Sequence, residues 1–471
     1  MFVARKKERK LLESAYQEKS SQFIAIYGRR RIGKTFLVRE VFGNSMTFQH
    51  AGLAEGDLKD QLFAFCSSLK DAGLRDFVQP SNWLEAFELL KDLVRQSKDK
   101  RKVLFIDELS WMDTRKSGLL TALESFWNGW ASARKDVMLI VCASATSWMM
   151  DKIIHNKGGL YNRLTRQICL SPFTLRDCEE LLQAKGIEMN PHQIIEGYMI
   201  LGGVPYYWDY LERGKSLPQN IDALFFAADA PLKHEFDYLY ASLFRSPEDY
   251  IAIVSALGRR KAGMHRDELA RAAHLENSGL LTAKLSELES CGFIRRYHAF
   301  GKKARDSYYQ LIDNFTLFYF KFLHQAPQDE RFWSNGVNTA ARNAWCGVAF
   351  ERVCLEHTTQ IKRALGISGV QTDISSWSCK ADADRGLFGS QIDLLIARQD
   401  QVVNLCEIKY ARDDYALTRK EEEKLRHRTS DFLTATKTRS SVHVTLVTPY
   451  GLKENSYSGS VQAVITGEDL F

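Results

Sequence analysis

The sequence predicts an α/β protein of about three domains, and three observations carry this prediction. The chain has 471 residues, whereas one domain usually holds about 150. Over residues 1–210, short apolar and β-branched runs alternate with helical patterns, which favours a parallel sheet with helices on both faces. After residue 235 the pattern changes to compact helices, and after residue 341 a helix is followed by several short strands.

Composition excludes several classes of protein. Hydrophobic residues make up 45% of the chain and charged residues 26%, with only 9 Pro, so a collagen-like or disordered chain is excluded. The 9 Cys form no CxxC pair and suit no closed disulfide framework. The N-terminus has no apolar signal segment, and the most apolar stretch, residues 137–150, is too short to span a bilayer. A cytoplasmic protein with no membrane partner is expected, and the net charge of +6 argues only weakly for a nucleic-acid partner.

A glycine-rich loop follows the first predicted strand, SQFIAIYG. Gly28, four residues and Gly33-Lys34-Thr35 have the Walker A spacing, with a strand before and a helix after, as this motif requires. Such glycines let backbone N–H groups turn toward phosphate oxygens, and the helix N-terminus adds a positive dipole end. Lys34 is expected to reach the β- and γ-phosphates of ATP, and Thr35 to bind Mg²⁺. The predicted nucleotide-binding segment is Gly28, Arg29, Arg30, Arg31, Ile32, Gly33, Lys34, Thr35 and Phe36, in which the arginines are expected to face solvent or a neighbouring subunit.

Two acidic residues end the next buried strand, RKVLFIDELS. Asp107 is expected to hold Mg²⁺ through water, and Glu108 to orient and deprotonate the attacking water. The alternative is that both acids only cap a helix. A third strand, DVMLIVCASA, is followed by Ser144, whose side chain is expected to sense the γ-phosphate, although a serine at a strand end is often structural.

These motifs resemble the archaeal-type ATPases, a STAND-like branch of the AAA+ P-loop superfamily, over residues 1 to about 210. The resemblance includes an opening box of Phe2, Val3, Arg5 and Glu8, the stretch LYNRLTRQICLSPF, and the segment Gly202-Gly203-Val204-Pro205. It implies that Arg5 lies near the adenine, that Pro205 follows a helical lid, and that Arg163 or Arg166 approaches the γ-phosphate. Ala4 and Ala143 stand where the family usually has Gly.

The second predicted domain, residues 211–325, ends in three helical patterns and two strands around a Gly-Lys-Lys turn, which is the winged-helix arrangement. The expected wing gathers basic residues near aromatic ones: Arg295, Arg296, Lys302, Lys303 and Arg305. The preceding helix, SGLLTAKLSELESCG, has one Lys and two Glu, which is poor for reading bases. Contact with DNA phosphates and a purely structural role both remain open.

The third predicted domain spans residues 326–471 and opens with a polar linker near 326–340. Asp393 and Glu407 lie in two apolar strand patterns, fourteen residues apart, which suits a hairpin. Glu407 and Lys409 share one strand face because positions two apart project together. Glu351, on a preceding helix, is expected to add a third acid. Converging carboxylates bind Mg²⁺ and can activate water on a phosphodiester.

This pattern resembles the PD-(D/E)xK nuclease core, which also occurs as the C-terminal partner of many archaeal-type ATPases. The resemblance implies Asp393 and Glu407 as metal ligands and Lys409 as the residue that orients water. The alternatives are an exposed strand with polar alternation and a folded but inactive nuclease. The charge run TRKEEEKLRHR, residues 418–428, indicates a solvated helix face.

The sequence therefore predicts an ATP-binding and ATP-hydrolysing protein that acts on nucleic acid, DNA first and RNA not excluded, with ATP and Mg²⁺ as cofactors. A nucleotide-controlled switch with an inert C-terminal domain is the alternative. A third alternative, an ATPase that serves as a transcriptional regulator, is supported only by the predicted winged helix. A homo-oligomer is left open.

Overall fold

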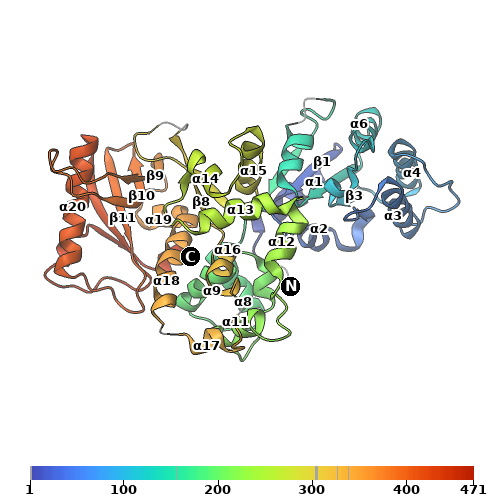
Figure 1. Cartoon of the computed structure of the whole chain (residues 1–471). Coiled ribbons are helices and arrows are strands. Elements are labelled where there is room, and N and C mark those ends of the chain that lie inside the picture. The colour runs from blue at the N-terminus through green and yellow to red at the C-terminus, as the bar shows by residue number, and fades with distance from the viewer. Residues whose placement is uncertain (1–2, 156–157, 245, 303–305, 326, 338) are drawn as a thin grey trace. The chain divides into compact units, whose positions relative to one another are not determined.

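The computed structural model describes residues 3–155, 158–244, 246–302, 306–325, 327–337 and 339–471. The chain divides into two compact units, one ending at Pro172 and the other beginning at Phe173 (Figure 1). Across the described residues, no helix has the length and apolar character needed to cross a membrane.

The first unit is built on a parallel sheet of five strands in the order β2-β3-β4-β1-β5. The strands are β1 (Gln22–Tyr27), β2 (Met46–Ala51), β3 (Lys102–Asp107), β4 (Val137–Ala143) and β5 (Arg166–Cys169). The helices are α1 (Lys6–Gln17), α2 (Lys34–Phe42), α3 (Leu58–Asp71), α4 (Trp83–Gln96), α5 (Leu109–Met112), α6 (Leu119–Gly129) and α7 (Thr146–Met149). The order sets β4 between β1 and β3, so the ends of these three strands meet at one edge of the sheet.

Both faces of this sheet are buried, as the apolar runs predict. Phe23 and Ala25 of β1 pack in one core cluster with Phe65 of α3. The alternate residues Ile24 and Ile26 pack in a second cluster with residues of α1 and α2. Because successive side chains of a strand point to opposite faces, two separate clusters require helices on both sides. The predicted two-faced parallel sheet is confirmed.

The second unit begins with helices α8 (Leu175–Ala184), α9 (Pro191–Leu201), α10 (Pro205–Asp209), α11 (Leu217–Phe225) and α12 (Glu235–Leu243). Phe173 N–H donates to the Gly203 carbonyl at 2.6 Å, and Tyr198 Oη donates to the Phe173 carbonyl at 2.8 Å. These contacts join Phe173 to the segment after α9. The structure therefore groups residues 173–210 with the second unit, whereas the sequence places them in the first domain.

Three helices and a three-stranded sheet follow, and these are the elements that the winged-helix prediction requires. They are α13 (Pro247–Gly258), β6 (Met264–His265), α14 (Arg266–Ala272), α15 (Gly279–Ser290), β7 (Ile294–Tyr297) and β8 (Tyr308–Leu311). The sheet has the order β6-β8-β7, and both strand pairs are antiparallel.

The predicted polar linker near 326–340 is exposed at most of its described residues and is anchored by one buried side chain, Trp333. It contains α17 (Phe332–Asn335), and the next helices are α18 (Ala340–Glu356) and α19 (Thr358–Ala364), with α16 (Asn314–Phe318) before it. Trp333 is only 2% exposed and packs edge-on against Phe318 and Trp345. The Asp222 carboxylate accepts the backbone N–H groups of Trp333, at 2.7 Å, and Ser334, at 3.0 Å. A large buried aromatic and a capped helix start hold this segment in place.

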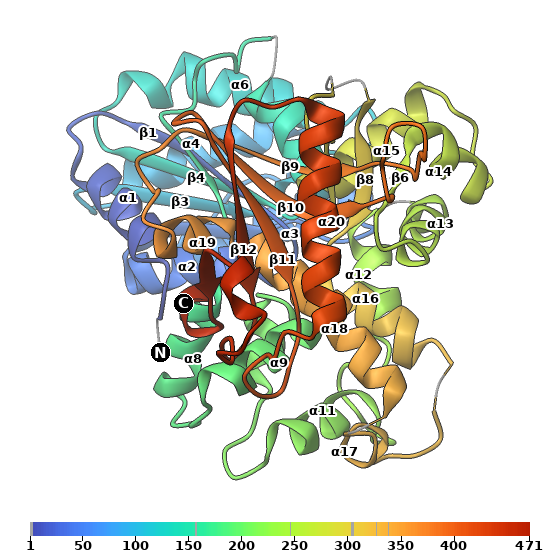
Figure 2. The ribbon, with the colours of Figure 1, turned by 90° about the vertical axis from the view of Figure 1, so that its left-hand side faces the viewer.

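A second five-stranded sheet, in the order β13-β12-β11-β10-β9, ends the chain. Its strands are β9 (Thr372–Ser378), β10 (Gln391–Arg398), β11 (Val402–Ile408), β12 (Ser441–Val447) and β13 (Ala463–Ile465). β9, β10 and β11 are antiparallel, and β12 runs parallel to β11 after the crossover helix α20 (Arg419–Thr436). Helix α20 lies across one face of the sheet (Figure 2), where its Phe432 packs with Leu395 and Leu405.

Candidate functional site

The loop between β1 and α2 has the backbone that a phosphate-binding loop needs. Gly28 has φ +139° and Gly33, which caps α2, has φ +88°. A Cβ on Gly28 would lie 2.3 Å from the Leu170 carbonyl oxygen and 2.8 Å from a methyl carbon of Ile32. Both the dihedral angle and the close approach therefore exclude a side chain at residue 28.

We expect Gly28→Ala to destabilise the first unit by about 2–4 kcal/mol, because it adds a steric clash to an unfavourable φ. Chemical denaturation checks this. Gly129→Ala is the matched control, since Gly129 lies at the end of a helix with nothing within 4 Å of an added Cβ. Equal stability of the two variants would contradict this account of the loop.

Lys34 is buried at the centre of the loop. Its side chain is 5% exposed, and its ammonium donates to the carbonyls of Gly28, at 2.9 Å, and Arg29, at 3.0 Å. A third bond, of 3.0 Å, reaches Ser144 Oγ at the end of β4. The predicted Walker lysine thus meets the predicted γ-phosphate sensor directly, because β1 and β4 are neighbours in the sheet.

Thr35 and Asp107 also meet, as a magnesium site would require. Thr35 Oγ1 donates to Asp107 Oδ2 at 2.5 Å. Asp107 is 5% exposed, and burial raises the pKa of its carboxyl group, while the hydrogen bond from Thr35 opposes that rise. A hydroxyl and a carboxylate that converge on one point suit the oxygen ligands that Mg²⁺ prefers, so these residues fit the ion.

Glu108 is held by Ser144. It has a left-handed φ of +47°, which turns its side chain toward β4. Ser144 Oγ donates to Glu108 Oε1 at 2.5 Å, and the Ser144 N–H donates to Oε2 at 3.1 Å. Lys34, Ser144 and Glu108 therefore form one chain of hydrogen bonds. The sequence places Lys34 in the glycine loop and the two other residues just after strand ends, but it contains no signal for the bond between Ser144 and Glu108.

The other predicted nucleotide-binding residues differ in their surroundings. Arg5 donates to the carbonyls of Ile32, at 3.3 Å, and Ser171, at 2.6 Å, so the opening segment is tied to the loop. Phe2 lies outside the described residues. Ile32 is buried, Arg30 is exposed and Phe36 is 47% exposed. Arg29 is buried within the chain, so the expectation that the loop arginines face solvent or a neighbouring subunit is wrong for this residue.

The two candidate arginines lie at or just before β5, and Pro205 lies in the second unit. Arg163 is exposed, whereas Arg166 on β5 pairs with Glu18 at 3.1 Å. Arg163 is thus the more available of the two, and its role stays a prediction. Pro205 opens α10 in the second unit.

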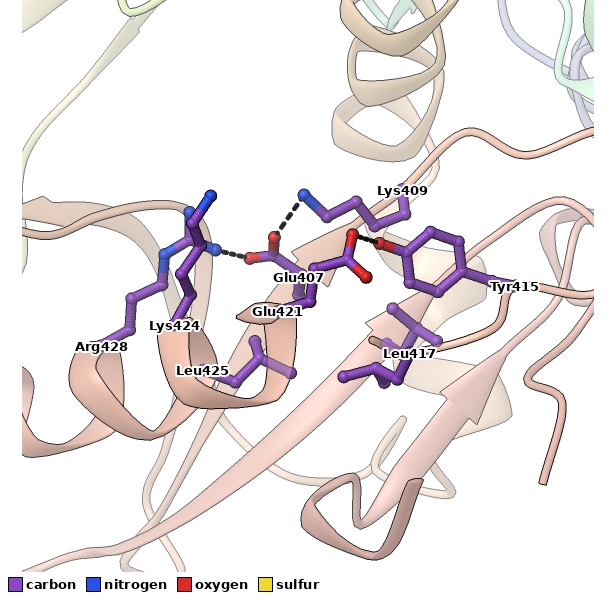
Figure 3. A pocket seen from close by; sticks show the side chains of 9 residues that line it. Glu407, Lys409, Tyr415, Leu417, Glu421, Lys424, Leu425 and Arg428 are labelled. Carbon is purple, nitrogen blue, oxygen red and sulfur yellow. Dashed lines mark hydrogen bonds and ion pairs between the residues drawn. The ribbon is translucent and has the colours of Figure 1, made fainter. Parts of the chain in front are cut away.

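The predicted nuclease residues form two groups, each with its own cations. Lys261, in the loop after α13, contacts Glu351 at 2.5 Å and Asp393 at 3.1 Å. On β11, Glu407 pairs with Lys409 at 2.9 Å and with Arg428 of α20. Figure 3 shows Glu407 between these two cations, in a pocket that α20 also lines with Lys424 and Glu421. The charge run predicts a solvated helix face. The face of α20 that carries Arg428 instead contacts Glu407.

A β-bulge explains why the carboxylates separate. The pairing of β10 with β11 ends at Leu394–Cys406, and one further step of the same register would place Asp393 opposite Glu407, as the hairpin prediction requires. However, the pairing of β10 with β9 shifts register between Ile392 and Leu395, and both of these residues pack in the cluster that contains Phe432. A bulge offsets the alternation of side chains. Asp393 therefore meets Glu351 and Lys261, while Glu407 meets α20.

The three predicted carboxylates consequently do not form one metal site in this arrangement. Among the described residues, no group of three or more His, Cys, Asp or Glu side chains could hold a metal ion. Sequence reasoning did not find Lys261 or Arg428, because each lies far along the chain from the motif that it contacts and no spacing rule connects them.

The segment predicted as the wing contacts the C-terminal sheet. Arg295 donates to Gln310 Oε1 at 2.6 Å, and burial lowers the pKa of its guanidinium group to about 10. Beyond β7, Ala299 bridges to Ser376 of β9, and Phe300 N–H donates to the Ser376 carbonyl at 2.7 Å. Arg296 and Lys302 are exposed, and Lys303 and Arg305 lie outside the described residues. Of the predicted basic patch, Arg295 is thus already used inside the protein.

A glycine loop that encloses a buried lysine, with a threonine–aspartate pair beside it, defines the first unit as a P-loop ATPase. Residues 2–211 match the family described as an ATPase domain predominantly from Archaea. Over these residues the chain is thus similar to a family of P-loop ATPases.

Two curated relatives come from Methanocaldococcus jannaschii. An uncharacterized protein is 25% identical over 425 residues, which cover 87% of this chain and 88% of the relative. An uncharacterized ATP-binding protein is 46% identical over 44 residues, which cover 9% of this chain and 75% of the relative. The first match extends over both units of the structure.

Solved structures give more distant matches. The Walker-type ATPase of Pyrococcus abyssi has a TM-score of 0.46 at 16% identity, with 67% of this chain and 95% of that chain covered. The ORC2 protein of Aeropyrum pernix in its ADPNP and ADP complexes has a TM-score of 0.41 at 14% identity, with 76% and 96% covered. At these scores neither likeness bears on function.

Proposed function

We propose that this ATPase acts on nucleic acid, and that its C-terminal domain is a nuclease-like module which ATP binding or hydrolysis controls. For the ATPase half, the observation that carries the proposal is the chain of bonds from Lys34 through Ser144 to Glu108. Lys34 would neutralise the phosphates, Thr35 and Asp107 would hold Mg²⁺, and Glu108 would take the proton of the attacking water.

For the nucleic-acid half, the supporting observation is that Asp393 and Glu407 lie on the adjacent antiparallel strands β10 and β11, next to the pair Leu394–Cys406, with Lys409 bonded to Glu407. These are the residue types of a nuclease core on adjacent strands. In the present arrangement basic side chains neutralise the carboxylates, so metal-dependent cleavage requires a different arrangement.

We expect Asp393→Ala and Lys409→Ala each to lower cleavage of DNA or RNA at least about 100-fold, because each removes a charge from the reacting centre. The measurement is cleavage of mixed DNA and RNA substrates with Mg²⁺, with and without ATP. Asp400→Ala is the matched control, since Asp400 lies just beyond β10 in an exposed ion pair with Arg398. Cleavage that persists in both site variants would refute the nuclease half.

A second candidate function is a nucleotide switch with an inert C-terminal domain. The neutralised carboxylates favour it, because Lys261, Lys409 and Arg428 already satisfy the charges that a metal ion would need. It predicts no cleavage by the wild-type protein, together with a change of particle size between ADP and a slowly hydrolysed ATP analogue. Light scattering separates the two candidates.

A further inference from the structure

Lys261 reaches the C-terminal carboxylates from another part of the second unit. It lies between α13 and β6, within the winged-helix elements, whereas Glu351 is on α18 and Asp393 is on β10. Its ammonium contacts Glu351 Oε2 at 2.5 Å and Asp393 Oδ2 at 3.1 Å. One cation therefore bridges two of the three carboxylates that the sequence assigns to metal binding.

Burial and neighbouring cations act in opposite directions on the pKa values of the two carboxyl groups of this bridge. Glu351 is almost fully buried, and burial raises the pKa of its carboxyl group, while Arg352 and Lys261 oppose the rise. Burial also acts to raise the pKa of Asp393, but the charge and hydrogen bond of Lys261, together with hydrogen bonds from Gln391 and Glu351, lower that pKa overall. Arg352 also pairs with Glu351, from Nη1 to Oε1 at 2.8 Å, so the buried Glu351 carboxylate keeps a cation when Lys261 leaves. Lys261 is the cation that contacts Asp393, whose side chain is 29% exposed.

The loop that carries Lys261 is pinned at its backbone. The Lys261 carbonyl accepts from Arg352 Nη2 at 2.6 Å and from Gln310 Nε2 at 2.6 Å. Tyr297 Oη donates to the next carbonyl, that of Ala262. The loop is therefore attached both to α18, a helix of the C-terminal domain, and to the strands of the wing.

The wing makes a second attachment to the same domain. Besides the bridge between Ala299 and Ser376, the ring of Phe300 packs 5.2 Å from that of Phe432 on α20. β9 is the edge strand of its sheet, so the wing covers an edge that would otherwise expose unpaired backbone groups. The winged-helix elements thus hold the C-terminal domain at two points, the edge strand and the carboxylate pair.

We propose that Lys261 is a built-in counter-cation that closes the Glu351–Asp393 pair against a divalent metal ion. The pair accepts the ion only when the 259–263 loop withdraws. This contact would keep the proposed nuclease site inactive, and its biological meaning rests on that proposed function. A movement of the winged-helix elements would exchange one cation for another, because lysine ammonium and metal compete for the same oxygens.

Metal binding in the full-length protein tests this directly, without nucleic acid or ATP. We expect Lys261→Gln to bind Mn²⁺ at least about tenfold more tightly than the wild type by calorimetry, since the competing charge is gone. Lys261 is 46% exposed in its side chain, so the substitution should leave the fold intact. Lys284→Gln is the matched control, because Lys284 pairs with Asp249 on the same winged-helix elements.

The double variant Lys261→Gln/Asp393→Asn should lose the gain, which assigns it to the carboxylate pair. Unchanged Mn²⁺ affinity in Lys261→Gln, or a gain that survives in the double variant, would overturn the proposal. As a measurement that needs no variant, Mn²⁺ should speed hydrogen exchange of the 259–263 amides in the wild type, and unaltered exchange at saturating Mn²⁺ would also overturn it. Tighter metal binding without any cleavage would remove the nuclease function and leave the counter-cation in place.

Discussion

Replacing Glu108 with Gln is expected to lower the rate of ATP hydrolysis about 100- to 1000-fold while ATP binding changes little. A general base contributes roughly this factor, and the amide cannot take a proton from water. Gln keeps the size of the side chain and can still accept the hydrogen bond from Ser144 Oγ, and only the bond from the Ser144 N–H is lost, so the site should largely keep its shape. The reduced rate would then report on proton transfer and not on folding.

The measurement compares steady-state ADP release with the affinity for a fluorescent ATP analogue. Glu40→Gln serves as the matched control because Glu40 is exposed on α2, away from the acidic pair. A Glu108→Gln protein that hydrolyses ATP within about threefold of the wild-type rate would exclude Glu108 as the base.

The second large effect is expected for Lys34→Ala, which should reduce kcat/KM for ATP at least about 100-fold. The variant removes the charge that would face the phosphates, and one such electrostatic contact is worth about 2.7–4 kcal/mol in a preorganised site. It also leaves the Gly28 and Arg29 carbonyls without the donor that they have in the wild type. Unlike Glu108→Gln, it should weaken nucleotide binding as well.

Nucleotide affinity and kcat/KM should be measured on the same preparation, with thermal unfolding as a check that the protein is folded. Lys98→Ala is the control, since Lys98 is exposed in the turn between α4 and β3. Retention of a third or more of the wild-type kcat/KM by Lys34→Ala would mean that the loop does not bind ATP through this lysine.

The ATPase site could be predicted almost completely because its residues follow local rules. A glycine loop between strand and helix, and polar residues at the ends of buried strands, are read from spacing alone. The strand order β3-β4-β1 then brings Asp107, Ser144 and Lys34 together. The burial of Arg29 could not be predicted, because it depends on the packing around the loop and not on the motif.

The C-terminal domain was harder to predict, since its outcome depends on a bulge and on distant cations. The sequence places Asp393 and Glu407 on adjacent strands correctly. The same alternation rule fails at the shift between Ile392 and Leu395, because nothing in the residues of β10 marks it. The segment near 326–340 is polar and mostly exposed, as a linker would be, but the burial of Trp333 anchors it, which composition does not indicate.

The sequence by itself determined the class of the first unit, its ATP-binding loop and the acidic pair, because these features depend on neighbouring residues and on the strand–loop–helix context. Only the tertiary structure decided which charges meet. Lys261 contacts Glu351, 90 residues further along the chain, and Asp393. Arg428 contacts Glu407, 21 residues before it. Ion pairs over such separations are set by how helices and sheets pack, and a linear pattern carries no record of that packing.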